Sequence, residues 1–131
     1  MQSDSATAPV SRKMRWAGYI VSALPAGGLV LSAAMKFIQP PEMADQMDKL
    51  GWSMDMALML GILELSCVII YLIPRTAVLG AILLTGFLGG AIATHVRIDD
   101  NFVAPIIVSV LAWLGLYLRD ARIRALIPLR S

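Results

Sequence analysis

Four apolar stretches, each long enough to cross a lipid bilayer as a helix, occupy most of the chain. A membrane-spanning helix needs about 17–25 predominantly apolar residues. The four stretches are residues 16–36, 57–73, 77–96 and 102–118. Prolines or short polar segments separate them, and little sequence remains for a soluble domain. We therefore expect a short basic tail over residues 1–15 and a helical transmembrane domain over residues 16–131.

The composition supports a membrane protein. Hydrophobic residues make up 58% of the chain and charged residues only 15%, whereas a soluble domain carries about 25% charged residues. The mean hydropathy is +0.74. These values argue against a soluble enzyme, a nucleic-acid-binding protein and a disordered chain. The lone Cys67 cannot form an intramolecular disulfide, and no zinc, phosphate-loop or dinucleotide-binding motif is present.

The basic residues predict the orientation of the chain. Eight of them lie on the side of the two termini, while the other side holds three basic residues and six acidic ones. The positive-inside rule then places both termini in the cytoplasm, most simply at a bacterial inner membrane. Short connections at Pro74–Thr76 and Asp99–Asn101 make sequential helices antiparallel. The predicted fold is an all-α bundle of four antiparallel transmembrane helices.

Glu64 is the most informative residue because it lies inside the second apolar stretch. A lone carboxylate at that depth costs several kcal/mol unless it is protonated or paired. Helix direction brings Lys36 and His95 to the same outer third of the bundle, so either can be its partner. Two interpretations stay open. The three residues form a structural ionic clamp, or they line an outward-facing pocket in which a carboxylate and an imidazole handle protons.

The pocket interpretation defines the candidate site. Catalytic candidates are Glu64, His95 and Lys36, and the predicted ligand-binding residues are Lys36, Glu64, Thr94, His95, Met43 and Met47. A metal site made of Glu64 and His95 alone would have too few ligands, so no metal is predicted.

The connection after the first stretch predicts a short amphipathic helix on the membrane surface, within Pro41–Asp55. Its apolar stripe consists of Met43, Met47, Leu50 and Met54, and Gly51 is expected to end the helix. Such a helix would lie over the mouth of the pocket. The methionines of this region are either ligands for Cu(I) or, as we favour, a flexible lining for an apolar surface.

Small residues predict where the helices approach one another. Gly86 and Gly90 are four residues apart in the third stretch, and Gly28 precedes Ser32 and Lys36 at the same spacing in the first. Small residues at this spacing let helices pack closely in lipid. We therefore expect these glycines to lie at contacts between helices.

With these features, the chain resembles the DoxX-like family of small four-helix membrane proteins, and the resemblance extends from about Trp16 to Pro128. The segments that carry the resemblance are Ser32–Lys36, Leu60–Glu64, Leu72–Ala81, Gly89–Arg97 and Leu116–Asp120. The resemblance implies redox work, since a distant relative resembles a subunit of a thiosulfate:quinone oxidoreductase. It also implies a bound quinone, with Lys36 or His95 donating to a carbonyl oxygen. The paired cysteines needed for thiol chemistry are missing.

Three functions remain open from the sequence. The first is a redox-associated membrane subunit that binds a quinone or another small apolar ligand. The second is a non-catalytic scaffold or assembly factor for a partner membrane protein. The third is an oligomeric transporter or proton pathway. The expected partners are the lipid bilayer, a membrane or redox protein and a second copy of the chain, and no nucleic acid.

Overall fold

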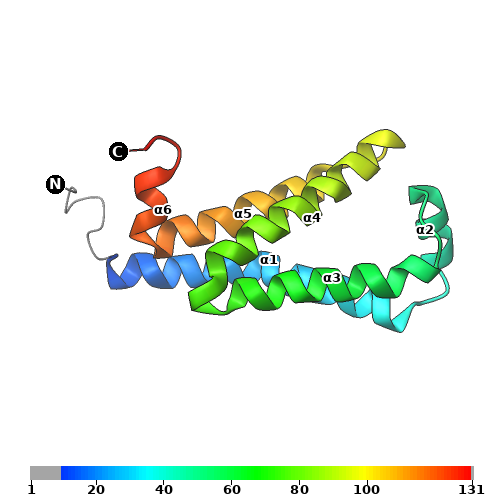
Figure 1. The fold of residues 1–131 in the computed structure, drawn as a ribbon, viewed down its shortest axis with the longest axis horizontal. Coiled ribbons are helices and arrows are strands. Elements are labelled where there is room, and N and C mark those ends of the chain that lie inside the picture. Colours follow the sequence, from blue (N-terminus) through cyan, green and yellow to red (C-terminus); the bar gives the residue numbers. More distant parts are fainter. Residues whose placement is uncertain (1–9, 131) are drawn as a thin grey trace.

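The structure is a computed structural model that describes residues 10–130. The described part of the chain is helical, without strands (Figure 1). Its elements are α1 (Arg12–Ile38), α2 (Met43–Leu50), α3 (Asp55–Leu72), the 3₁₀ turn η2 (Pro74–Thr76), α4 (Ala77–Arg97), α5 (Val103–Arg119) and α6 (Ala121–Leu126). The all-α prediction is confirmed for these residues.

The helix boundaries follow local sequence signals. The side chain of Ser11 accepts a hydrogen bond from the backbone N–H of Met14 at 3.2 Å and so caps α1. At its other end α1 stops before Pro40, with Gln39 in a left-handed conformation. Residues 12–15 of the expected tail over residues 1–15 are helical, so α1 begins four residues before the first apolar stretch. Residues 1–9 of that tail lie outside the described residues.

Three segments are long and apolar enough to cross a membrane by length and composition, namely Arg12–Ile38, Asp55–Leu72 and Pro74–Arg97. The fourth apolar helix, α5, has 17 residues and is shorter than these. Large apolar side chains on all four helices face outward in the single chain, among them Ile20, Leu58, Ile82 and Val110. Such extensive apolar exposure is typical of a protein surrounded by lipid.

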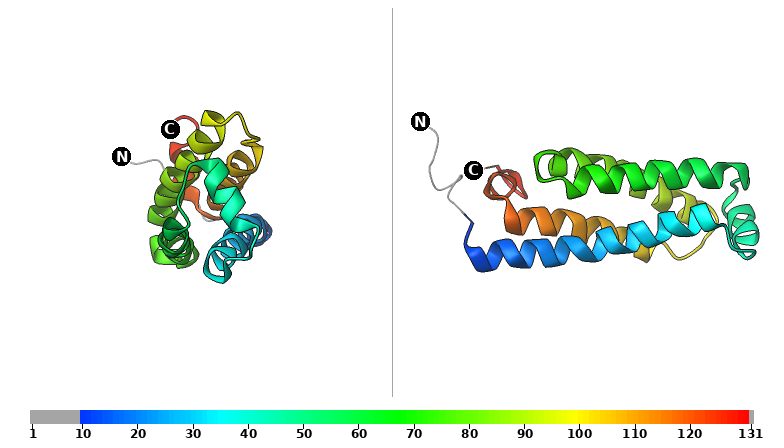
Figure 2. Two further views of the ribbon diagram at one scale, coloured as in Figure 1. Left: turned by 90° about the vertical axis from the view of Figure 1, so that its right-hand side faces the viewer. Right: turned by 90° about the horizontal axis from the view of Figure 1, so that it is seen from below.

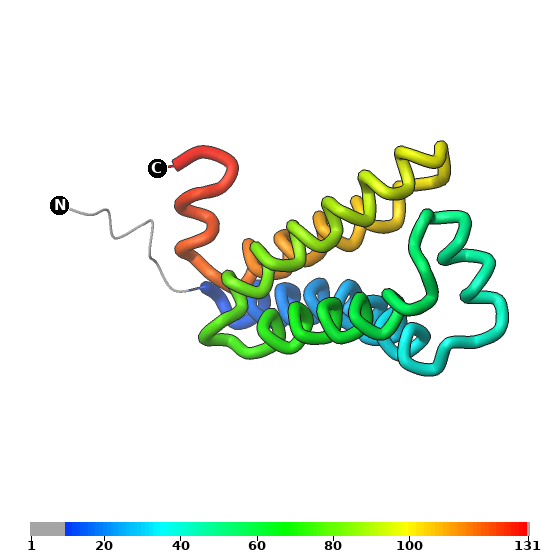
Figure 3. The backbone as a smooth tube through the Cα atoms, turned by 45° about the vertical axis from the view of Figure 1, so that its right-hand side comes forward, coloured from blue at the N-terminus to red at the C-terminus, as the bar shows by residue number. Residues whose placement is uncertain are grey.

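The four long helices pack in a ring, in which α1 contacts α3 and α5, and α4 contacts the same two helices. Successive helices run in opposite directions (Figures 1 and 2). Toward the end that carries α2, the pair α4 and α5 diverges from the pair α1 and α3 (Figures 1 and 3). Tyr71 of α3 lies in the core, where its hydroxyl donates to the carbonyl of Ala112 on α5 at 2.7 Å.

The closest helix contacts use glycines other than those expected. A Cβ added at Gly80 would clash with the backbone of Tyr71, and one added at Gly115 would clash with Ser22. In contrast, a Cβ added at Gly28, Gly86 or Gly90 would meet no atom within 4 Å. The prediction that these three glycines lie at contacts within the chain was wrong, because spacing alone does not define which face of a helix turns inward.

Two short helices lie across the ends of the bundle, approximately perpendicular to its long axis. α2 covers the end where α1 finishes and α3 begins, and α6 leaves α5 at the opposite end (Figures 1 and 2). Acidic side chains gather on and beside α2, whereas α6 and the start of α1 are rich in arginine. We call these the acidic end and the basic end of the molecule.

Candidate functional site

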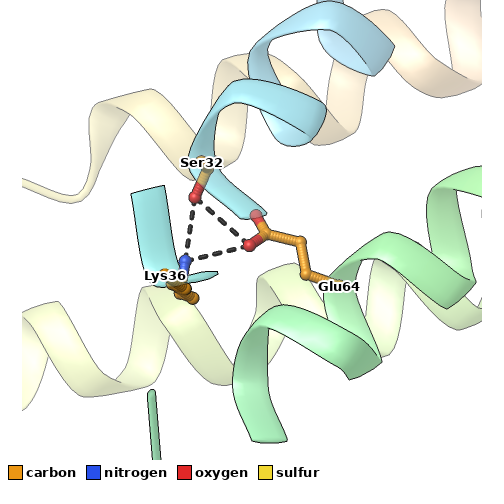
Figure 4. A network of polar contacts seen from close by, with 3 residues as sticks. All are labelled: Ser32, Lys36 and Glu64. Carbon is orange, nitrogen blue, oxygen red and sulfur yellow. Dashed lines mark hydrogen bonds and ion pairs between the residues drawn. The ribbon is translucent and has the colours of Figure 1, made fainter. Parts of the chain in front are cut away.

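Glu64 lies on the buried face of α3, with only 2% of the residue exposed. Its Oε1 atom is 2.9 Å from the Nζ atom of Lys36 on α1, and the two side chains form a salt bridge (Figure 4). The predicted proximity of Lys36 and Glu64 is therefore confirmed. Ionic pairing removes much of the cost that an isolated carboxylate would have at this position.

Ser32 completes a closed network of three side chains. It precedes Lys36 by one helical turn, so both residues lie on the same face of α1. The hydroxyl of Ser32 donates to Glu64 Oε1 at 3.2 Å and accepts from Lys36 Nζ at 2.9 Å (Figure 4). The lysine ammonium has three N–H groups, of which the network uses two. One N–H therefore remains for another acceptor.

Gly61 lets α1 approach α3 at this level. It lies one turn before Glu64, and a Cβ added there would lie 3.0 Å from the Cβ of Lys36. The closeness of the two helices brings the lysine stem against α3 and holds its ammonium beside the buried carboxylate. The network is thus built by backbone approach as well as by charge.

A cavity of about 420 Å³ lies between the last turns of α1 and the helix α2. It is lined by Ser32, Met35, Lys36, Pro40, Glu42, Met43, Gln46, Met47 and Leu50. Ser32 and Lys36 belong to the ionic network, so the cavity has a polar side as well as an apolar one. Its volume falls within the range of about 300–1,000 Å³ that is usual for small-molecule sites.

The helix α2 turns its methionines inward, as the sequence predicts. Met43 and Met47 are buried and pack with Ala57 of α3, while Met54 is partly buried beside them. Gly51 adopts a left-handed conformation, with φ of 84°, and ends the helix at the predicted residue. The expected amphipathic helix is therefore present, and it covers the cavity.

His95 and Thr94 lie near the end of α4 and bond to their own helix. His95 Nδ1 is 2.7 Å from the carbonyl oxygen of Ala91, and the Thr94 hydroxyl donates to the carbonyl of Gly90 at 2.8 Å. Neither residue lines the cavity. The structure therefore unites Lys36, Met43 and Met47 around the cavity and pairs Lys36 with Glu64, but does not bring His95 or Thr94 into that arrangement. The divergence of α4 from α3 at this end accounts for the difference (Figure 3).

Two contacts that the sequence does not reveal tie α2 to the end of α4. A guanidinium nitrogen of Arg97 donates to the carbonyl of Leu50, and Lys49 forms a 3.9 Å ion pair with Asp100. The last carbonyls of a helix have no donor partner within the helix, and cations are favoured beside them. The predicted end of α2 at Gly51 was therefore the sequence signal that a basic side chain would bind there.

Comparison with known proteins identifies a family. Searches of the curated proteins and of the solved structures give no match. Residues 20–115 match the model of the DoxX-like family. The matched region includes the ionic network and the whole lining of the cavity, while α6 lies beyond it. Because the match covers most of the chain, the protein belongs to the DoxX-like family.

Proposed function

We propose that the protein spans the membrane four times, with α5 as the fourth span and both termini in the cytoplasm. The 17 residues of α5 reach the lower limit of a transmembrane helix. α5 also packs along α1 and α4, so it shares their environment. The excess of arginine and lysine at the basic end supports a cytoplasmic location for that end, as at a bacterial inner membrane.

Within this arrangement, we infer that the cavity at the acidic end binds a small, mostly apolar molecule that carries an acceptor oxygen. The observation that carries this proposal is the unused N–H of Lys36 beside a methionine-lined cavity. Because Glu64 already neutralises Lys36, the cavity does not require an anionic ligand. A carbonyl or hydroxyl oxygen would accept the remaining hydrogen bond, and methionine side chains would adapt to the apolar body.

A quinone is the ligand that we favour. Its head group has two carbonyl acceptors on a flat apolar ring, which suits a cavity whose lining combines the Lys36 ammonium with several thioethers. Lys36 would hold a carbonyl oxygen, while Met43 and Met47 would contact the ring. A bound quinone supplies redox chemistry, and in that case the protein would serve as the quinone-binding subunit of a redox assembly.

Titration with decylubiquinone in detergent tests this proposal. Trp52 follows the cavity-lining Leu50 by two residues, so quenching of its fluorescence reports on binding once Trp16 and Trp113 are replaced by phenylalanine in every protein compared. We expect saturable quenching by the wild-type protein. The double variant Lys36→Met with Glu64→Gln removes the donor without leaving a buried charge. It should bind about three- to tenfold more weakly, the range expected for one lost hydrogen bond.

The matched control is Lys13→Met, which removes an exposed lysine at the opposite end of the molecule, away from the cavity and from the contacts of α2. Its affinity should equal that of the wild type. Unsaturable quenching, or equal affinities for the wild-type protein and the double variant, would contradict quinone binding at Lys36.

A scaffold for a partner membrane protein, or for a second copy of the chain, is the second candidate. The observation that favours it is the open space beside Gly86, Gly89 and Gly90 on α4. Small residues on an open helix face allow another helix to approach closely in lipid. A stable partner that copurifies with the protein, together with no saturable quinone binding, would favour this function over the first.

A further inference from the structure

Arg119 lies at the basic end and has no hydrogen-bond acceptor among residues 10–130. Its guanidinium carbon lies 5.2 Å from the ring centre of Tyr19 and 5.5 Å from that of Tyr71. The Nε atom is buried and unpaired. Aromatic faces attract the cation but accept few of its N–H groups. The side chain is therefore held in place while its hydrogen-bonding capacity stays unused.

Close packing between α1 and α5 determines the position of Arg119. Gly18 of α1 faces it, and a Cβ added at Gly18 would lie 2.7 Å from the Cβ of Arg119. The glycine therefore provides the room for the arginine between α1 and α5. An arginine that is positioned by close packing, with its donors unpaired, is suited to receive a ligand that supplies acceptors.

Further cations lie around Arg119. At the start of α6, Asp120 accepts from the backbone and side chain of Arg122. A guanidinium nitrogen of Arg124 contacts the sulfur of Met14 at 2.6 Å, which places α6 beside the start of α1. There α1 exposes three more cations, Arg12, Lys13 and Arg15. Among the described residues of this end, Asp120 is the single carboxylate, and it is committed to Arg122.

Apolar side chains next to these cations indicate what kind of anion they meet. Trp16, which packs edge-to-face with Tyr19, is 61% exposed, and Leu129 after α6 is 81% exposed. Tryptophan and tyrosine favour the boundary between lipid headgroups and acyl chains. A phospholipid supplies both the phosphate oxygens for the cations and acyl chains for these apolar groups, whereas a free phosphate ion supplies the oxygens alone.

We propose that the basic end binds the phosphate headgroup of an anionic phospholipid, with Arg119 as the central donor. The planar guanidinium can give two parallel hydrogen bonds to phosphate oxygens. Arg124 and the cations at the start of α1 add attraction toward the negative surface. The cations of this site lie outside the region matched by the family model, which covers residues 20–115.

Lipid-dependent quenching of Trp16 tests the proposal. The full-length protein carries Trp52→Phe and Trp113→Phe, so that Trp16 is the remaining tryptophan. It is reconstituted in phosphatidylcholine with increasing amounts of phosphatidylglycerol whose acyl chains are brominated. We expect phosphatidylglycerol to be preferred over brominated phosphatidylcholine. In Arg119→Gln the preference should fall at least about fivefold, the effect of losing one cation at an anionic membrane surface.

Two further variants and one competitor distinguish specific lipid binding at Arg119 from general electrostatic attraction to an anionic membrane. Arg119→Lys keeps the charge but loses the planar fork, so it should recover only part of the preference. Lys49→Gln removes the same charge at the acidic end and should leave the preference unchanged. Inorganic phosphate at millimolar concentration should not compete if a lipid is the ligand, and competition would instead assign the site to free phosphate. Equal quenching by the two lipids, or an unchanged preference in Arg119→Gln, would overturn the proposal.

Discussion

The two ends of the molecule differ in whether their basic side chains are paired within the chain, although one short helix lies across each end. At the acidic end, every basic side chain of the described residues has a partner within the chain. Lys36 pairs with Glu64, Lys49 with Asp100, and Arg97 with the carbonyl of Leu50. These contacts close α2 over a cavity. The basic side chains of the acidic end are therefore paired within the protein.

At the basic end, the single described carboxylate, Asp120, pairs with Arg122. Arg119 lacks an acceptor, and the basic residues that begin α1 are exposed. The difference teaches that burial, more than the number of charges, decides where ions pair within the chain. A buried carboxylate such as Glu64 requires a partner inside the protein, whereas exposed cations at a membrane surface can find theirs in the lipid.

The largest effect is expected from breaking the ion pair at the acidic end. Lys36→Met leaves the buried Glu64 carboxylate without a counter-ion and should lower the free energy of unfolding by about 3–5 kcal/mol. Glu64→Gln should cost less, because the Lys36 side chain is 19% exposed and its ammonium can turn toward water. Thermal unfolding in detergent measures both variants.

The double variant Lys36→Met with Glu64→Gln serves as the control for that experiment. It removes both charges, so much of the stability lost in Lys36→Met should return. If Lys36→Met unfolds at the wild-type temperature, the pair contributes little and the acidic end does not depend on internal pairing.

A smaller effect is expected from Gly18→Ala at the basic end. The added Cβ would lie 2.7 Å from the Cβ of Arg119 and 2.8 Å from the carbonyl oxygen of Gly115. Such overpacking should cost about 1–3 kcal/mol and displace Arg119 from the tyrosine rings. Gly28→Ala on the same helix is the matched control, since its Cβ would meet no atom within 4 Å. Equal unfolding temperatures for the two variants would show that packing does not position Arg119.

The sequence predicts the structural features that depend on residues close together in the chain better than those that depend on packing between helices. Pro40 and Pro74 mark helix ends, and the helices lie within a few residues of the predicted stretches. Helix direction and depth placed Lys36 and His95 at the level of Glu64, but they left open which of the two pairs with it. The rotation of each helix about its axis did not follow, because it depends on packing partners. Gly86 consequently faces open space, while Gly80, not singled out from its spacing, contacts Tyr71.

The tilt of the helices relative to one another could not be predicted from the sequence either. His95 lies in the last turn of α4, where it bonds to Ala91 and not to Glu64. Toward this end α4 diverges from α3 (Figure 1). Ser32 could have been found, since it lies one turn before Lys36 on the same helix face. The contact between Arg97 and Leu50 joins segments far apart in the chain and required the three-dimensional structure.

The smallest effect concerns pH at the basic end. Burial works to raise the pKa of Asp120, but the hydrogen bonds and charge of Arg122, together with the charge of Arg119, outweigh it and lower that pKa below its usual value. A carboxylate with a depressed pKa in the folded state stabilises the fold above its unfolded pKa of about 3.9. This contribution disappears as the pH falls through the lower folded value. Since the Arg122 side chain is 79% exposed, we expect the ion pair to contribute under about 1 kcal/mol to the free energy of unfolding.

Asp120→Asn isolates this contribution, because asparagine caps a helix about as well as aspartate but does not titrate. The difference in unfolding temperature between the wild type and Asp120→Asn should be constant from pH 7 to about 5 and shrink toward pH 3. Taking the difference removes the effect of the acidic-end carboxylates, which both proteins share. A difference that stays constant down to pH 3 would mean that Asp120 and Arg122 do not stabilise the fold as an ion pair. Arg122 would then be a further free cation, and the contrast between the two ends would be sharper than the structure suggests.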